Sequence, residues 1–174
     1  HERLTGTPAE DAPWPEPDDT LLDPGVEAAE AQVERLVDDI QGIQQSLRNA
    51  DEDVPEADPD RIRVAVAADW KHRVFDTVTE IGADQGAVMS EVMSEPDLRE
   101  RGNAVNDLVS ELIEFARARD ADELDALADL DEAAMYRNAV GFLGTEFDAD
   151  IVVTVEADDS SAIPLRPSID LEAA

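Results

Sequence analysis

Residues that commonly carry out catalysis are nearly absent from this 174-residue chain. It contains no cysteine, which removes thiol nucleophiles, disulfides and cysteine-ligated zinc. Only two histidines occur, His1 and His72, and the sequence holds neither a Gly-x-Ser-x-Gly elbow nor a Gly-rich phosphate loop with its lysine. We therefore expect no catalytic residue, no metal ligand and no cofactor in this chain. A hydrolase that uses His72 as its base is the weakest hypothesis.

A calcium loop is the nearest approach to a metal motif. Asp120 and Asp122 have the spacing of its first two ligands, but Leu124 and Asp125 stand where such a loop needs a ligand and a glycine. We interpret these carboxylates as solvated surface.

The chemistry that the sequence does offer is a short basic window. Between residues 61 and 73, four cations stand against one acid, Asp69. Guanidinium groups stack on bases and bond bidentately, and the first N–H groups of a helix favour phosphate. We predict that the four cations of this window form one RNA-binding cluster, with a further RNA-binding residue near the end of the chain: Arg61, Arg63, Lys71, Arg73 and Arg166. The alternative is that these cations only offset nearby acids on a solvated face.

The charge balance limits how RNA could be bound. With 44 acidic and 13 basic residues, the formal net charge is −31. Such a surface repels itself, and that repulsion is screened when the Debye length falls to about 3 Å near 1 M salt. We therefore expect a halophilic protein; an acidic nucleic-acid mimic and a disordered acidic tail are the alternatives. With about four phosphate contacts, affinity would fall on the order of 10⁴-fold between about 0.15 and 3 M salt. Binding must then depend on directional hydrogen bonds and stacking.

The elements around these cations divide the chain into four parts. Residues 1–23 hold four prolines and Trp14, which favours an extended segment anchored by the indole. Asp23 and Pro24 begin a helix over 24–48, whose apolar stripe runs from Val26 to Leu47. Residues 49–60 are acidic and broken by prolines, as in a linker. Residues 61–174 form the last domain.

That last domain reads as a small α+β fold. Ile62, Val64 and Val66 alternate with more polar positions, which predicts a half-buried strand. Helices are expected over 69–81, 85–94, 103–119 and 131–146, with Asp69 and Asp131 as caps. Strands are expected at 151–156 and 168–171. Strands at both ends of a helical block predict a sheet of two to three strands that joins 61–68 to 151–156.

Three motifs carry a resemblance to a known family. Ala67, Trp70 and Lys71 match an Ala-Pro-Glu-Trp-Lys turn, with Ala68 and Asp69 in place of the proline and glutamate. The final segment keeps the order Pro164, Arg166, Pro167, Ile169, Glu172, and the opening has Trp14 before a long helix. Together they resemble the C-terminal region of archaeal and eukaryotic-type leucyl-tRNA synthetases, here in a halophilic archaeal version.

The resemblance implies a non-catalytic module that recognises the long variable arm of leucine tRNA. ATP and leucine would be bound elsewhere in the parent enzyme. The implied partners are leucine tRNA and other synthetase domains, in a cytoplasmic monomer that does not enter a membrane. The alternative function is an acidic docking module without RNA binding, which would use the stripe from Val26 to Leu47.

Overall fold

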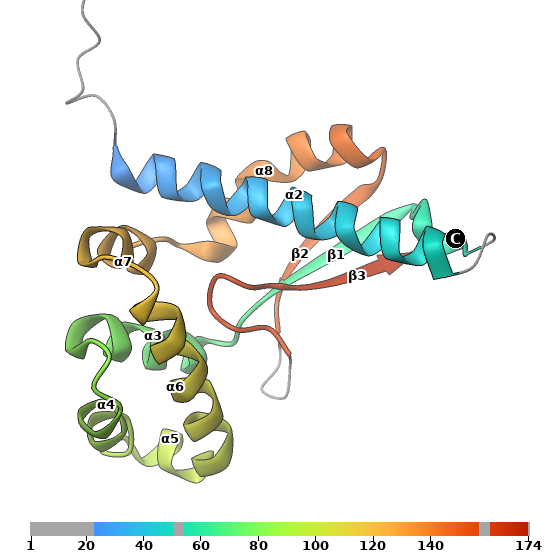
Figure 1. Cartoon of the computed structure of the whole chain (residues 1–174). Helices are drawn as coiled ribbons and strands as arrows, with labels where there is room; N and C mark the ends of the chain where they lie inside the picture. Colours follow the sequence, from blue (N-terminus) through green and yellow to red (C-terminus); the bar gives the residue numbers. More distant parts are fainter. Residues whose placement is uncertain (1–22, 51–53, 157–160, 174) are drawn as a thin grey trace, which may run out of the picture.

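The computed structural model describes residues 23–50, 54–156 and 161–173 (Figure 1). The expected extended segment with Trp14 lies outside the described residues. Within them, a three-stranded sheet is combined with several helices, so the predicted α+β class is confirmed. The elements follow in the order α2 (Pro24–Ala50), η2 (Pro55–Ala57), β1 (Arg61–Val66), α3 (Asp69–Ile81), α4 (Gln85–Val92), α5 (Pro96–Glu100), α6 (Gly102–Arg117), α7 (Ala121–Ala128), α8 (Glu132–Phe147), β2 (Asp150–Val155) and β3 (Ser168–Glu172).

Strand β1 is the centre of the sheet, whose order is β2-β1-β3. It pairs with β2 in parallel, Ile62 opposite Ile151, and with β3 in antiparallel, Ile62 opposite Leu171. A parallel pair needs a long crossover, which the block from α3 to α8 supplies. The predicted meeting of the two ends of the domain is therefore confirmed.

One face of this sheet packs against α2 and α8 (Figure 1). Ile62 and Val64 are fully buried there, together with Leu36 and Ile40 of α2 and Leu143 of α8. Most of the apolar stripe of α2 is thus covered within the chain. Asp23 begins this helix by accepting a hydrogen bond from the Gly25 amide at 2.9 Å.

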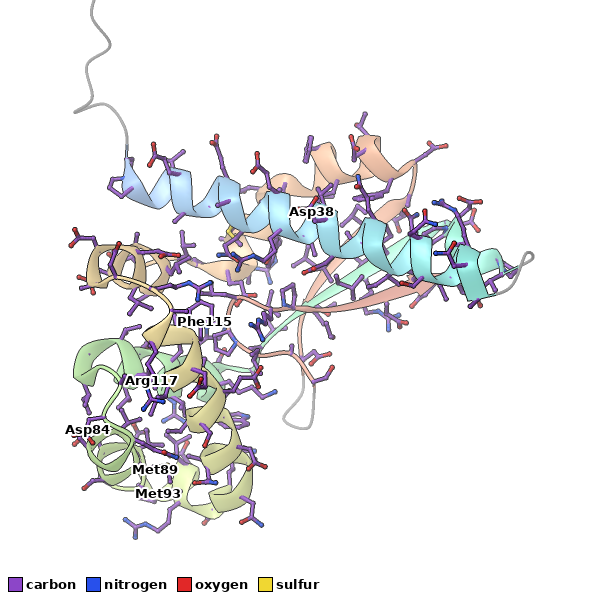
Figure 2. All side chains as sticks on the ribbon, viewed as in Figure 1. Asp38, Asp84, Met89, Met93, Phe115 and Arg117 are labelled. Carbon is purple, nitrogen blue, oxygen red and sulfur yellow. The ribbon has the colours of Figure 1, made fainter. Side chains whose placement is uncertain are left out.

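Helices α3 to α6 form a second cluster with its own core. Val74, Val78 and Leu98 are fully buried, and Phe75 meets Phe115 edge to face with ring centroids 6.0 Å apart. Trp70 belongs to this core, at 6 % exposure. Figure 2 shows Met89 on α4, Met93 at the C-terminal end of α4, and Phe115 on α6, in this part of the molecule.

Three local details differ from the predicted elements. The N-cap of α3 is Ala68, and Asp69 lies in the first turn, where a carboxylate favours the positive end of the helix. Two short helices, α5 and α7, were not expected, because runs of five and eight residues carry too little apolar periodicity to be recognised. Asp131 does cap α8, by accepting from the Ala134 amide at 2.9 Å.

No helix among the residues described is both long enough and apolar enough to cross a membrane.

The contact of α2 with the sheet can be tested by truncating Ile40, which is 0 % exposed. Ile40→Ala leaves a cavity and should lower the free energy of unfolding by about 2–5 kcal/mol. Ile81→Ala is the matched control, because Ile81 is 37 % exposed; it should cost less than about 1 kcal/mol. Urea unfolding in constant high salt measures both. Equal losses would contradict the assignment of Ile40 to the core.

Candidate nucleic-acid interface

Arg61 and Arg63 project from the face of the sheet opposite α2 and α8. Successive residues of a strand point to opposite faces, so these arginines alternate with buried Ile62 and Val64. Their side chains are 51 % and 45 % exposed. Of the predicted RNA-binding residues, these two are brought side by side.

Carboxylates from the flanking strands hold both arginines. Arg61 lies 3.1 Å from Asp150 of β2 and 3.7 Å from Glu172 of β3. Arg63 donates a hydrogen bond to Glu172 and lies 3.6 Å from Asp170. Half-exposed ion pairs of this kind contribute only about 0–1 kcal/mol each. A ligand with better acceptors can therefore replace the carboxylates at small cost.

Two further predicted residues lie at other places. Arg73 of α3 donates to Glu95 and to Asp97, and the hydrogen bond to Asp97 raises the pKa of Arg73 while lowering that of Asp97. Arg166 lies 3.1 Å from Glu111 of α6, and its side chain is 56 % exposed. Both reach solvent, each beside helices rather than on the open sheet face.

Lys71 is not a surface cation. It is 5 % exposed, and its ammonium donates to the carbonyl oxygen of Ala162 at 2.5 Å. Burial lowers the pKa of Lys71, while the charge of Glu156 acts to raise it. The prediction that Arg61, Arg63, Lys71 and Arg73 form one cluster is therefore wrong. The chain changes direction between β1 and α3, so closeness in sequence does not put these side chains on one surface.

The Lys71 contact joins two segments of the chain whose bonded residues are 91 positions apart. The strand-to-helix turn that ends in Lys71 meets the turn from Ala162 to Pro167, in which Ile163 and Arg166 exchange backbone hydrogen bonds of 3.2 and 2.9 Å. The Leu165 amide in this turn donates to the Glu132 carboxylate at 3.1 Å. Sequence reasoning missed Glu132, because one glutamate among 44 acidic residues carries no local signal.

Beside Glu132 lies a cavity of about 250 Å³ whose lining includes Asp69, His72, Asp76 and Asp131. His72 Nε2 is 3.5 Å from Glu132 Oε2. Burial lowers the pKa of His72 and raises the pKa of Glu132 to about 7. No serine, threonine, cysteine or lysine is among the described residues of this lining. Within residues 23–50, 54–156 and 161–173, no three His, Asp or Glu side chains are arranged so that they could hold a metal ion. The described lining of this cavity therefore holds no hydroxyl, thiol or amine side chain that could act as a nucleophile.

Glu132 generates a pH prediction. Its pKa of about 7 in the folded chain exceeds the ordinary value of 4.5, so its ionisation opposes folding as pH rises through this interval. Relative to Glu132→Gln, the wild-type chain should lose about 2–3 kcal/mol of stability between pH 4.5 and pH 8, at about 1.4 kcal/mol per pH unit. Urea unfolding at several pH values measures this difference. A difference that stays constant with pH would contradict the buried environment of Glu132.

Comparison with known proteins gives one consistent relationship. No protein-family model matches the chain. The leucine–tRNA ligase of Aeropyrum pernix is 32 % identical over 174 residues, that of Pyrococcus furiosus 29 % over 167, and that of Methanothermobacter thermautotrophicus 28 % over 171. These alignments cover 92–93 % of this chain and 16 % of each relative. Over nearly all of its length, the chain is therefore similar to one segment of archaeal leucine–tRNA ligases.

Proposed function

We propose that this chain is the non-catalytic C-terminal part of a leucine–tRNA ligase and contributes to recognition of leucine tRNA through its long variable arm. The observation that carries the proposal is the similarity to leucine–tRNA ligases over 92 % of the chain. The contact between Lys71 and Ala162 supports it, because Lys71 belongs to one motif of the resemblance and Ala162 lies two residues before another. ATP and leucine would be bound by other parts of the enzyme.

The RNA would lie on the open face of the sheet, against Arg61 and Arg63, with Arg166 and Arg73 as outlying contacts. On that face, two guanidinium groups stand among three carboxylates, those of Asp150, Asp170 and Glu172. The local charge is therefore not attractive overall. Phosphate or base acceptors would replace carboxylates on the arginine forks, and the bidentate geometry of the fork would provide the gain.

We further propose that the protein works in molar salt. A net charge of −31 on 174 residues opposes folding through self-repulsion unless counter-ions screen it. High salt would also weaken attraction between RNA and any exposed cation. The expected binding is therefore modest and depends on hydrogen bonds and stacking rather than counter-ion release.

The test is titration of the 174-residue chain with leucine tRNA, intact and with the variable arm removed, in KCl from 0.15 to 3 M. Circular dichroism reports whether the chain is folded at each salt concentration. Where it is folded, the intact tRNA should bind more tightly. The double change Arg61→Gln and Arg63→Gln should weaken that binding by about tenfold or more, since charged hydrogen bonds contribute about 1.5–3 kcal/mol each.

Arg117→Gln is the matched control. Arg117 is also an exposed arginine, at 55 %, and is paired with Glu114 on the same helix. Its loss should leave the affinity within about twofold of the wild type, as for a surface substitution away from an interface. Equal affinity for the two tRNAs would refute recognition of the arm. An equal loss in Arg117→Gln would refute the assignment to the sheet face.

A second candidate function, docking on protein, is favoured by one groove. A cavity of about 660 Å³ lies between the start of α2 and α8, with an apolar lining that includes Val26, Val33, Met135 and Phe142. Val26 is 54 % exposed and Phe142 56 %. Since the chain spans 16 % of the length of its relatives, the proposed occupant is an apolar segment elsewhere in the same ligase polypeptide.

This docking can be measured by sedimentation of the 174-residue chain mixed with the remainder of the ligase, produced separately. The two should associate, and Phe142→Ser should weaken association by about tenfold or more, as truncation of an interface anchor does. Ile81→Ser and Val155→Ser are matched controls, because both side chains are also exposed. The proposed occupant would be refuted if the two parts did not associate. It would also be refuted if this chain alone formed a dimer that Phe142→Ser caused to dissociate.

A further inference from the structure

The turn that presents Arg166 is held in an unfavourable backbone conformation. Leu165 has φ of 65°, in the left-handed region that costs a residue other than glycine about 1–3 kcal/mol. Leu165 is 3 % exposed, so the turn is packed into the molecule, and Arg166 is the one exposed residue between Ala162 and Pro167. Such a conformation persists only where the surroundings determine it.

Lys71 holds this turn from the side of α3. Its ammonium donates to the Ala162 carbonyl at 2.5 Å, from a residue that is 5 % exposed. A buried charge is unfavourable unless hydrogen bonds compensate its lost hydration. An apolar side chain of similar length would fill the same space more cheaply. What a lysine provides here, and an apolar side chain would not, is a hydrogen bond that fixes the position of Ala162.

Glu132 holds the same turn from the side of α8. Its side chain is 1 % exposed, and Oε2 accepts the hydrogen bond from the Leu165 amide at 3.1 Å. This carboxylate lies in the first turn of the helix, where the backbone dipole favours negative charge. It contacts the amide of the one residue in the turn with positive φ.

Glu156, just after β2, closes the arrangement. Its Oε2 accepts from the Ala162 amide at 3.4 Å, and its Oε1 accepts from the Ser168 hydroxyl at the start of β3. Ala162 is thus bound through both its amide and its carbonyl. Three ionisable side chains, from α3, from α8 and from the residue after β2, converge on a segment of seven residues, 162–168.

We infer that buried Lys71 and Glu132 are positioning residues that hold the turn from Ala162 to Pro167 so that Arg166 is presented in one fixed place. The inference about the turn stands on the hydrogen bonds alone. Its consequence for RNA rests on the proposed function. A guanidinium on a fixed turn loses less freedom on binding than one on a mobile turn, so its contact gives more affinity.

The experiment compares five variants of the 174-residue chain by amide hydrogen exchange in NMR and by titration with leucine tRNA. Arg166→Ala removes the proposed RNA contact itself. Lys71→Met and Glu132→Met remove the hydrogen bonds but keep apolar bulk. Glu132→Gln keeps an acceptor for the Leu165 amide and serves as the conservative rescue. Arg73→Met is the control on α3, because it removes an exposed cation two residues from Lys71.

Lys71→Met and Glu132→Met should speed exchange at Leu165 and Arg166 at least tenfold, without a matching change at Val78 or Val109 in the helical core. Both should weaken tRNA binding about as much as Arg166→Ala does. Glu132→Gln should behave like the wild type in both measurements, and Arg73→Met should leave exchange in the turn unchanged. If one methionine variant fails to fold, the other still tests the inference against Glu132→Gln or the control.

Wild-type exchange at Leu165 and Arg166 in both methionine variants would overturn the positioning role, whatever the RNA result. A second outcome is faster exchange in the methionine variants while Arg166→Ala still binds tRNA as the wild type does. That outcome would support the positioning role and refute the RNA contact of Arg166. The two failures are therefore distinguishable.

Discussion

The pairing of β1 with two strands from the far end of the chain is the constraint on which the structure depends. β1 begins at Arg61, and its partners begin at Asp150 and Ser168. The strands in register bring Arg61 opposite Asp150 on one side and Glu172 on the other. Because the β1–β2 pair is parallel, everything between them must form one crossover. The helical block is that crossover.

This pairing also separates the two kinds of chemistry on the sheet. Ile62 and Val64 point toward α2 and α8 and are fully buried, while Arg61 and Arg63 point away from them. A shift of register by one residue would bury guanidinium groups and expose the apolar set. The hydrophobic contact with α2 therefore fixes which face of the sheet is covered by α2 and α8 and which face carries the arginines. The hydrophobic contact already determines on which face Arg61 and Arg63 lie. Their ion pairs with the carboxylates only set the orientation of the two side chains on that face.

Charge has different roles on the surface and inside this molecule. At the surface, arginines are paired with acids in half-exposed contacts that contribute little to stability, as for Arg61 and Asp150. Inside, Lys71 and Glu132 each hold a backbone group of the turn that leads to Arg166. Removing either side chain would leave a buried backbone group without a hydrogen-bond partner. That costs folding free energy, because water does not reach the group to replace the lost bond. A chain with 44 acidic residues thus uses very few of its charges to define its structure.

The sequence by itself determined the fold class and the longer local elements. Asp23 with Pro24 marked the start of α2, the alternation from Arg61 to Val66 marked β1, and Asp131 marked α8, because caps and periodicity act between near neighbours. The family resemblance came from short motifs read in order. Only the tertiary structure decided that Lys71 is buried and that Glu132 binds the Leu165 amide. It also decided that Arg61 and Arg63 are separated from Arg73. Those outcomes depend on groups up to 91 residues away, such as Ala162, and no local pattern records which distant backbone atom a side chain will meet.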